Sequence, residues 1–149
     1  MNLKPTLALF LFWLASWLTP GAKAMSFDNF ARLTNDDKAN YVVFLVEAAA
    51  QVLKTHGQPD QAGKAIALFK DPGPNGGMHQ FASNMQMLNS LNNRNATNPN
   101  NRVPAAQIED VMALTLKGNG IIVSTKDLLA SSRSFVPDSP PPQHLIIYR

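Results

Sequence analysis

The sequence predicts an all-α fold: a small bundle of four to five helices, with at most a minor two-stranded β patch. Apolar side chains recur every three or four residues in several successive segments, which is the spacing of one helix face. Residues that favour helix starts precede these segments, and glycine or proline follows them. The chain contains no cysteine, so its fold depends on packing and not on disulfide bridges.

The longest helix is predicted over residues 36–55. Thr34 precedes it and Asp37 follows three residues later, as in a capping box. Apolar residues cover more of its circumference than an amphipathic helix needs, so we expect it at the centre, with partners on several sides. Gly57 stands where the helix is expected to end. The apolar positions are Tyr41, Val42, Phe44, Leu45, Val46, Ala48, Ala49, Val52 and Leu53.

Two further helices are predicted between residues 59 and 92. Pro59 opens the first, and the proline- and glycine-rich segment 71–77 ends it. The second runs from Met78 to about Asn92. Residues 92–101 hold six asparagines, whose side chains favour local turns, and so predict a loop. The expected buried positions are Ala62, Ala65, Ile66, Phe69, Met78, Phe81, Met85 and Leu88.

The last part of the domain is predicted to hold two shorter helices. Pro104 suits the first turn of one, which ends at the segment 117–120. Ser124 and Asp127 repeat the capping-box spacing and open the other. Between them, Ile121–Val123 is β-prone, and it is the candidate to pair with the C-terminal tail as the minor β patch if the tail folds back.

The first 24 residues predict a cleaved signal peptide. Lys4 is followed by an apolar run over residues 6–18, and Ala22-Lys23-Ala24 forms a small-x-small cleavage site. The run is shorter than the roughly 20 residues that span a bilayer. The predicted organisation is a signal peptide at 1–24, a single helical domain at 25–136, and a proline-rich tail with an apolar end at 137–149.

Composition limits the function of the remaining chain. Of 13 basic residues, Lys4 and Lys23 lie in the leader, so 11 face 10 acidic residues and the formal charge falls from +3 to +1. This balance predicts no nucleic-acid binding. The lack of cysteine excludes thiolate metal sites and a lipoprotein anchor. We expect a periplasmic or secreted protein, with the bacterial envelope favoured, and no stable membrane anchor after cleavage.

The sequence offers no clear catalytic group. No serine or cysteine motif for nucleophilic catalysis occurs, and no histidine has a second ligand at helical spacing. Most acidic residues fall in first turns of predicted helices, where we expect them to cap: Asp36, Asp37, Asp60, Glu109, Asp110 and Asp127. Glu47 lies mid-helix and is expected on a polar strip. A buried Glu47 facing His79 would instead favour an enzyme.

Methionine and histidine form one candidate metal site. Thioether and imidazole ligands suit Cu(I) in an oxidising compartment. The candidate ligands are Met78, His79, Met85 and Met87. The alternative interpretation is that Met78 and Met85, seven residues apart, fill the core. No other cofactor is predicted.

The tail carries the candidate partner-binding residues. Prolines stiffen the chain before its apolar end, which is formed by Leu145, Ile146, Ile147 and Tyr148. These residues either fold back on the domain or add to a partner.

The sequence therefore predicts a non-catalytic secreted or periplasmic interaction protein: an accessory subunit, an inhibitor or a chaperone-like binder. The expected partner is another envelope or extracellular protein. The alternative is a carrier of a small apolar ligand or of Cu(I), and an enzyme of unknown type is the third hypothesis.

Overall fold

A single long helix, α3 (Asn35–Thr55), forms the centre of the protein. The computed structural model describes residues 23–131, and within them all regular secondary structure is helical. Eleven of the 21 residues of α3 are buried, which matches the nearly all-round apolar pattern of its sequence. The all-α prediction is confirmed. None of the helices within this range is both long and apolar enough to cross a membrane.

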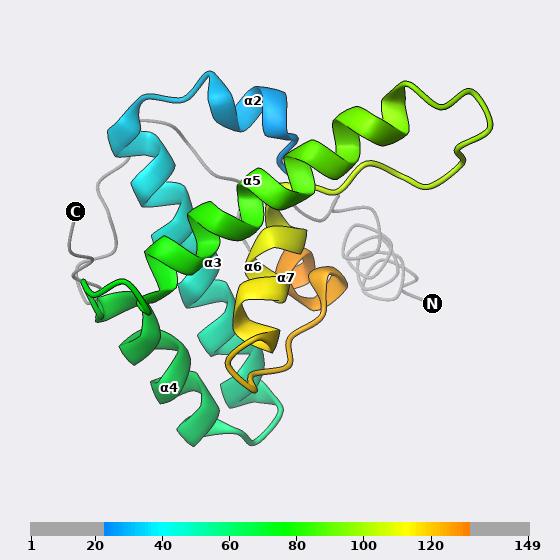
Figure 1. Ribbon diagram of the computed structural model, residues 1–149. Helices are drawn as coiled ribbons and strands as arrows, with labels where there is room; N and C mark the ends of the chain where they lie inside the picture. Colours follow the sequence, from blue (N-terminus) through cyan, green and yellow to red (C-terminus); the bar gives the residue numbers. More distant parts are fainter. Residues whose placement is uncertain (1–22, 132–149) are drawn as a thin grey trace, which may run out of the picture.

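Five other helices surround α3 in the described range (Figure 1). They are α2 (Phe27–Ala31), α4 (Pro59–Lys70), α5 (Gly77–Ala96), α6 (Ile108–Lys117) and α7 (Thr125–Ser131). Helix α4 turns back along one side of α3, while α6 and α7 pack on it elsewhere. Helix α5 crosses the domain and contacts both α4 and α6.

The start and the end of α3 follow the local sequence. The Thr34 side-chain oxygen accepts a hydrogen bond from the Asp37 N–H at 3.1 Å, and its hydroxyl donates to Asp37 Oδ2 at 3.0 Å. At the other end, Gly57 has a φ of +73°, which favours glycine. The Gln58 N–H donates to the Leu53 carbonyl at 2.8 Å and closes the turn into α4. The predicted capping of α3 is thus present.

Two helix boundaries differ from those predicted. Helix α5 continues through the first asparagines to Ala96, so residues 92–96 are not a loop. Helix α6 begins at Ile108, not near Pro104, because the Gln107 N–H donates to Asp110 Oδ2 at 2.7 Å and caps the helix there. In addition, residues 27–31, expected as a lead-in, form the short helix α2.

The β-prone segment Ile121–Val123 has no regular secondary structure. Ile121 and Val123 are buried, whereas Ile122 is exposed, so the segment is extended and packs alternate side chains into the core. Its expected partner, the C-terminal tail, lies outside the described residues.

Helices α4 and α5 meet at a site where a side chain does not fit. A Cβ atom added at Gly77 would lie 2.7 Å from carbons of the buried Phe69 ring. A contact this short forces the ring or the helix to move, so the start of α5 requires glycine.

We expect Gly77→Ala to lower the free energy of unfolding by about 1–3 kcal/mol, because the new methyl group overpacks the contact with Phe69. The matched control is Gly63→Ala in α4, where a Cβ would meet nothing within 4 Å. That change removes a helix-interior glycine and should raise stability by about 0.5–1 kcal/mol. Urea denaturation of both variants measures the two effects, and equal responses would contradict the packing argument.

Candidate interaction surface

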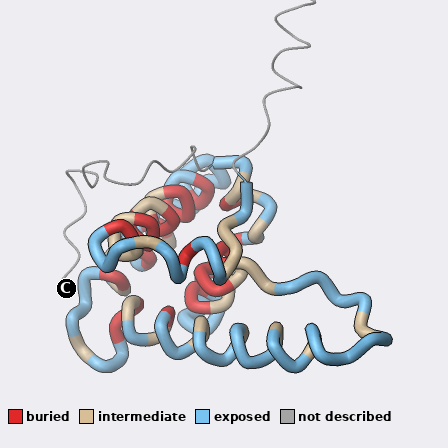
Figure 2. The backbone as a smooth tube through the Cα atoms, turned by 90° about the horizontal axis from the view of Figure 1, so that it is seen from above, coloured by how far each residue is buried: buried red, intermediate tan, exposed pale blue. Residues whose placement is uncertain are grey.

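The most distinctive surface is a projection that we call the arm, residues 86–107. It consists of the second half of α5 and the segment that returns to α6, and it extends beyond the other helices (Figures 1 and 2). None of its residues is buried. In α5 the buried residues are Gly77 and Phe81, both in the first half, whereas the second half contributes the half-buried Leu88 to the core packing.

A pair of hydrogen bonds closes the base of the arm. The Asn92 side-chain NH₂ donates to the Ala106 carbonyl at 3.0 Å, and the Ala106 N–H donates to Asn92 Oδ1 at 2.8 Å. This two-point contact joins α5 to the returning segment, as neighbouring strands would be joined in a sheet. Asn92 therefore fixes how the arm leaves the domain.

The tip of the arm is ordered by its asparagines. Asn98 Oδ1 accepts from the Asn100 N–H at 3.0 Å, and Asn101 Oδ1 accepts from the Val103 N–H at 3.1 Å. Such short-range bonds to the backbone are typical of asparagine in turns. The asparagines thus fix the backbone of the tip through these hydrogen bonds, and other side chains form the remaining surface of the arm.

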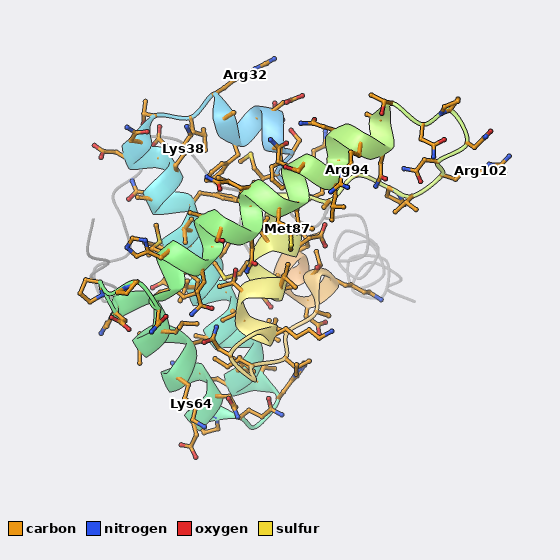
Figure 3. The ribbon with its side chains drawn as sticks, in the orientation of Figure 1. Arg32, Lys38, Lys64, Met87, Arg94 and Arg102 are labelled. Carbon is orange, nitrogen blue, oxygen red and sulfur yellow. The ribbon has the colours of Figure 1, made fainter. Side chains whose placement is uncertain are left out.

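The arm combines exposed apolar and basic side chains. Four large hydrophobic side chains are exposed in the described part of the chain, and three of them, Met87, Leu91 and Val103, lie on the arm. Met87 and Leu91 are one helical turn apart on α5. Arg94 and Arg102 are also exposed, with Arg102 near the tip (Figure 3). No acidic residue occurs between Asp71 and Glu109, so the arm carries basic charge without carboxylates.

A small cavity lies beside the base of the arm. It has a volume of about 240 Å³ and is lined by Phe27 and Phe30 of α2, Lys38 of α3, and Met85, Gln86 and Asn89 of α5, among others. Its wall is mixed, with aromatic and thioether groups beside amides and an ammonium. The volume is below the roughly 300–1,000 Å³ usual for ligand pockets.

Helix α5 separates the four candidate copper ligands. Met78 and Met85 are half-buried and pack against the core, whereas His79 and Met87 are exposed. Met78 and Met85 are also about 10 Å apart along the helix axis at 1.5 Å per residue. No group of three or more histidine or acidic side chains that could hold a metal ion occurs between residues 23 and 131. The structure therefore does not bring these ligands together.

The candidate tail residues Leu145, Ile146, Ile147 and Tyr148 lie outside the described residues. The described chain ends at Ser131, in the last turn of α7. The arm is thus the partner-binding candidate that the structure describes.

Glu109 is the polar residue that the sequence interpretation misplaced. It lies in the first turn of α6 as expected, but it is fully buried and does not act as a surface cap. Tyr41 donates its hydroxyl to Glu109, and the Met25 N–H donates to both carboxylate oxygens, at 3.1 and 3.0 Å. Glu109 shares a helix face with the buried Met112 and Leu116, and this spacing in the sequence could have indicated that Glu109 is buried.

This buried contact changes the titration of Tyr41. Burial raises the pKa of Tyr41 above its ordinary value, and the hydrogen bond to Glu109 and the charge of Glu109 raise it further. Two other acidic residues lie at capped helix starts: the Asp127 N–H donates to Ser124 Oγ at 3.1 Å, and Asp110 Oδ2 accepts from the Gln107 N–H at 2.7 Å. Glu47 is half-buried on α3 and His79 is exposed on α5.

We expect Asn92→Ala to loosen the arm without unfolding the protein. Both hydrogen bonds to Ala106 are lost, but no core contact changes. Backbone amides of residues 93–106 should exchange with deuterium faster, while the free energy of unfolding falls by no more than about 1–2 kcal/mol. The control is the exposed neighbour Asn93→Ala. Unchanged deuterium exchange in the Asn92 variant would show that the two hydrogen bonds between Asn92 and Ala106 do not hold the arm.

We expect Tyr41→Phe to destabilise the protein by about 1–3 kcal/mol near neutral pH, because Glu109 loses a buried donor. The folded-state pKa of Tyr41 is raised, so its contribution is complete below the ordinary tyrosine value near 10 and declines as pH rises above it. The stability difference between wild type and Tyr41→Phe should therefore shrink above about pH 10. Denaturation at pH 7 to 11 measures it, and a constant difference would refute the coupling.

Comparison of the chain with known protein families, with characterised proteins and with solved structures finds no match.

Proposed function

We propose that this protein is a non-catalytic interaction protein of the periplasm or the extracellular medium, which binds another protein through the arm. The observation that carries the proposal is the concentration of exposed apolar side chains there: Met87, Leu91 and Val103, on a segment that has no fully buried residue. A projecting helix end with such residues is suited to insertion into a groove of a partner.

The charge of the arm indicates the chemistry of that partner. Arginine and methionine are enriched in protein interfaces, whereas lysine, glutamate and aspartate are depleted. The arm has two arginines, the exposed Met87 and Leu91 on adjacent helical turns, and no acidic residue. The complementary surface is an apolar groove bordered by carboxylates.

The proposed location rests on the amino-terminal sequence. The positive start, the apolar run and the Ala22-Lys23-Ala24 site support export with removal of the leader. An exported domain that binds a partner through the arm is compatible with three roles: an accessory subunit, an inhibitor or a chaperone-like binder.

The second candidate is a carrier of a small apolar ligand, favoured by the cavity between α2 and α5. Phe27, Phe30 and Met85 supply its apolar wall, and its volume of about 240 Å³ suits a molecule smaller than most cofactors. The Cu(I) alternative has less support, because His79 and Met87 are exposed while Met78 and Met85 pack on the core.

We expect photo-crosslinking to detect the partner at the arm. A photoreactive amino acid in place of Leu91, in the chain produced in its own compartment, should give one discrete crosslinked product. The same amino acid in place of Lys64, exposed on α4 at the far end of the domain (Figure 3), should give none. No product at Leu91, or the same products at both positions, would contradict the proposal.

We expect charge reversal on the arm to abolish that product. Arg94→Glu with Arg102→Glu places two carboxylates against the acidic partner surface, which should reduce crosslinking from Leu91 at least about tenfold. Arg32→Glu with Lys64→Glu makes the same net charge change away from the arm and should leave the product unchanged (Figure 3). If both double substitutions reduced crosslinking equally, the net charge of the protein and not the position of the charges on the arm would determine binding.

A further inference from the structure

The predicted cleavage site and the buried carboxylate of Glu109 lie at the same place in the structure. Cleavage after Ala24 makes Met25 the first residue of the mature chain. The nitrogen of Met25 is the atom that Glu109 binds, at 3.1 Å from Oε1 and 3.0 Å from Oε2. Two independent observations, one from the leader sequence and one from the core, therefore meet at one atom.

The contact is poorly matched while the leader is attached. An amide nitrogen has one hydrogen, and here both carboxylate oxygens lie at hydrogen-bond distance from it. Glu109 is fully buried, and in the described part of the chain it accepts hydrogen bonds from two neutral groups, the Met25 N–H and the Tyr41 hydroxyl. Burying a carboxylate without a countercharge destabilises a fold strongly.

Cleavage creates a positive charge beside Glu109. Hydrolysis of the Ala24–Met25 bond consumes one water, leaves a carboxylate on Ala24, and converts the Met25 nitrogen into an amine that binds a proton near neutral pH. The ammonium has three hydrogens, enough for both oxygens of Glu109. We propose that the mature amino-terminal ammonium of Met25 forms a buried ion pair with Glu109, so that removal of the leader strengthens the fold.

The surroundings of Met25 hold its nitrogen in place for this role. The Met25 carbonyl accepts from the Ile108 N–H at 2.9 Å, so the residue is bound to α6 on both sides. Met25 itself is half-buried, whereas Lys23 and Ala24 are exposed and without regular structure. Loss of residues 1–24 thus removes no buried side chain from the described part of the leader. Tyr41 donates to the same carboxylate from α3, which completes its hydrogen bonding.

The first test identifies the amino terminus. The full chain is produced with its own leader in a bacterial envelope, and the product is analysed by intact mass and amino-terminal sequencing. The expected product begins at Met25. A product that begins at another residue, or that retains the leader, overturns the proposal. This result does not depend on the arm, so it is separate from the proposed interaction.

The second test is a double-mutant cycle on the exported protein. Inserting Gly-Ser between Ala24 and Met25 keeps the cleavage site but moves the ammonium away and restores an amide at Met25. With Glu109 present, the insertion should raise the unfolded fraction at least about tenfold, whereas in Glu109→Gln it should change it less than about twofold. The same loss in both backgrounds would show that the ammonium does not pair with Glu109.

A chemical measurement on the native sequence covers the case in which Glu109→Gln does not fold. The α-amine of the mature protein should react with an acylating reagent at neutral pH at least about tenfold more slowly than the α-amine of the Gly-Ser insertion protein. Denaturant should abolish the difference, and exposed Lys64 serves as the internal reference. Equal rates in the folded proteins would refute the ion pair.

Discussion

The structure depends on the central helix α3, which exposes only a small part of its surface to solvent. Eleven of the 21 residues of α3 are buried, and they face in most directions around its axis. Such a helix is stable only when other helices surround it. The tight turn at Gly57 brings α4 back along it, and α6 and α7 return to cover other faces. Helix α5 spans α4 and α6, and its fully buried residues all lie in its first half.

The chain departs from a plain helical bundle in two places. One is the second half of α5, which projects from the domain, and the other is the buried Glu109. The first leaves an apolar and basic segment outside the domain. The second places a carboxylate in a mainly apolar core, in the part of α6 that also buries Ile108 and Met112. The positive end of α6 lowers the cost of that charge, since Glu109 lies in its first turn. Each departure is costly in a simple bundle, which is why each supports a functional interpretation.

The central helix could be predicted because its signals are local. The Thr34–Asp37 cap, the apolar run and Gly57 lie within one segment, and all three act as the sequence indicates. The end of α5 could not be predicted in this way. Asparagine propensity favours a turn from Asn92, but Asn92 bonds to Ala106, a residue 14 positions away, and the helix continues. The same holds for Glu109, whose partners Met25 and Tyr41 are 84 and 68 residues distant.

The arm also marks a point at which the continuous chain can be divided into two parts. A break at its tip, near Asn100, separates a piece with α2 to α5 from a piece with α6 and α7. Helices α6 and α7 pack on α3, and α6 also packs on α5, so most of the core contacts of the second piece are made with the first. Exposed polar tips tolerate such breaks. We therefore expect two separate chains, divided at this tip, to assemble into the folded domain.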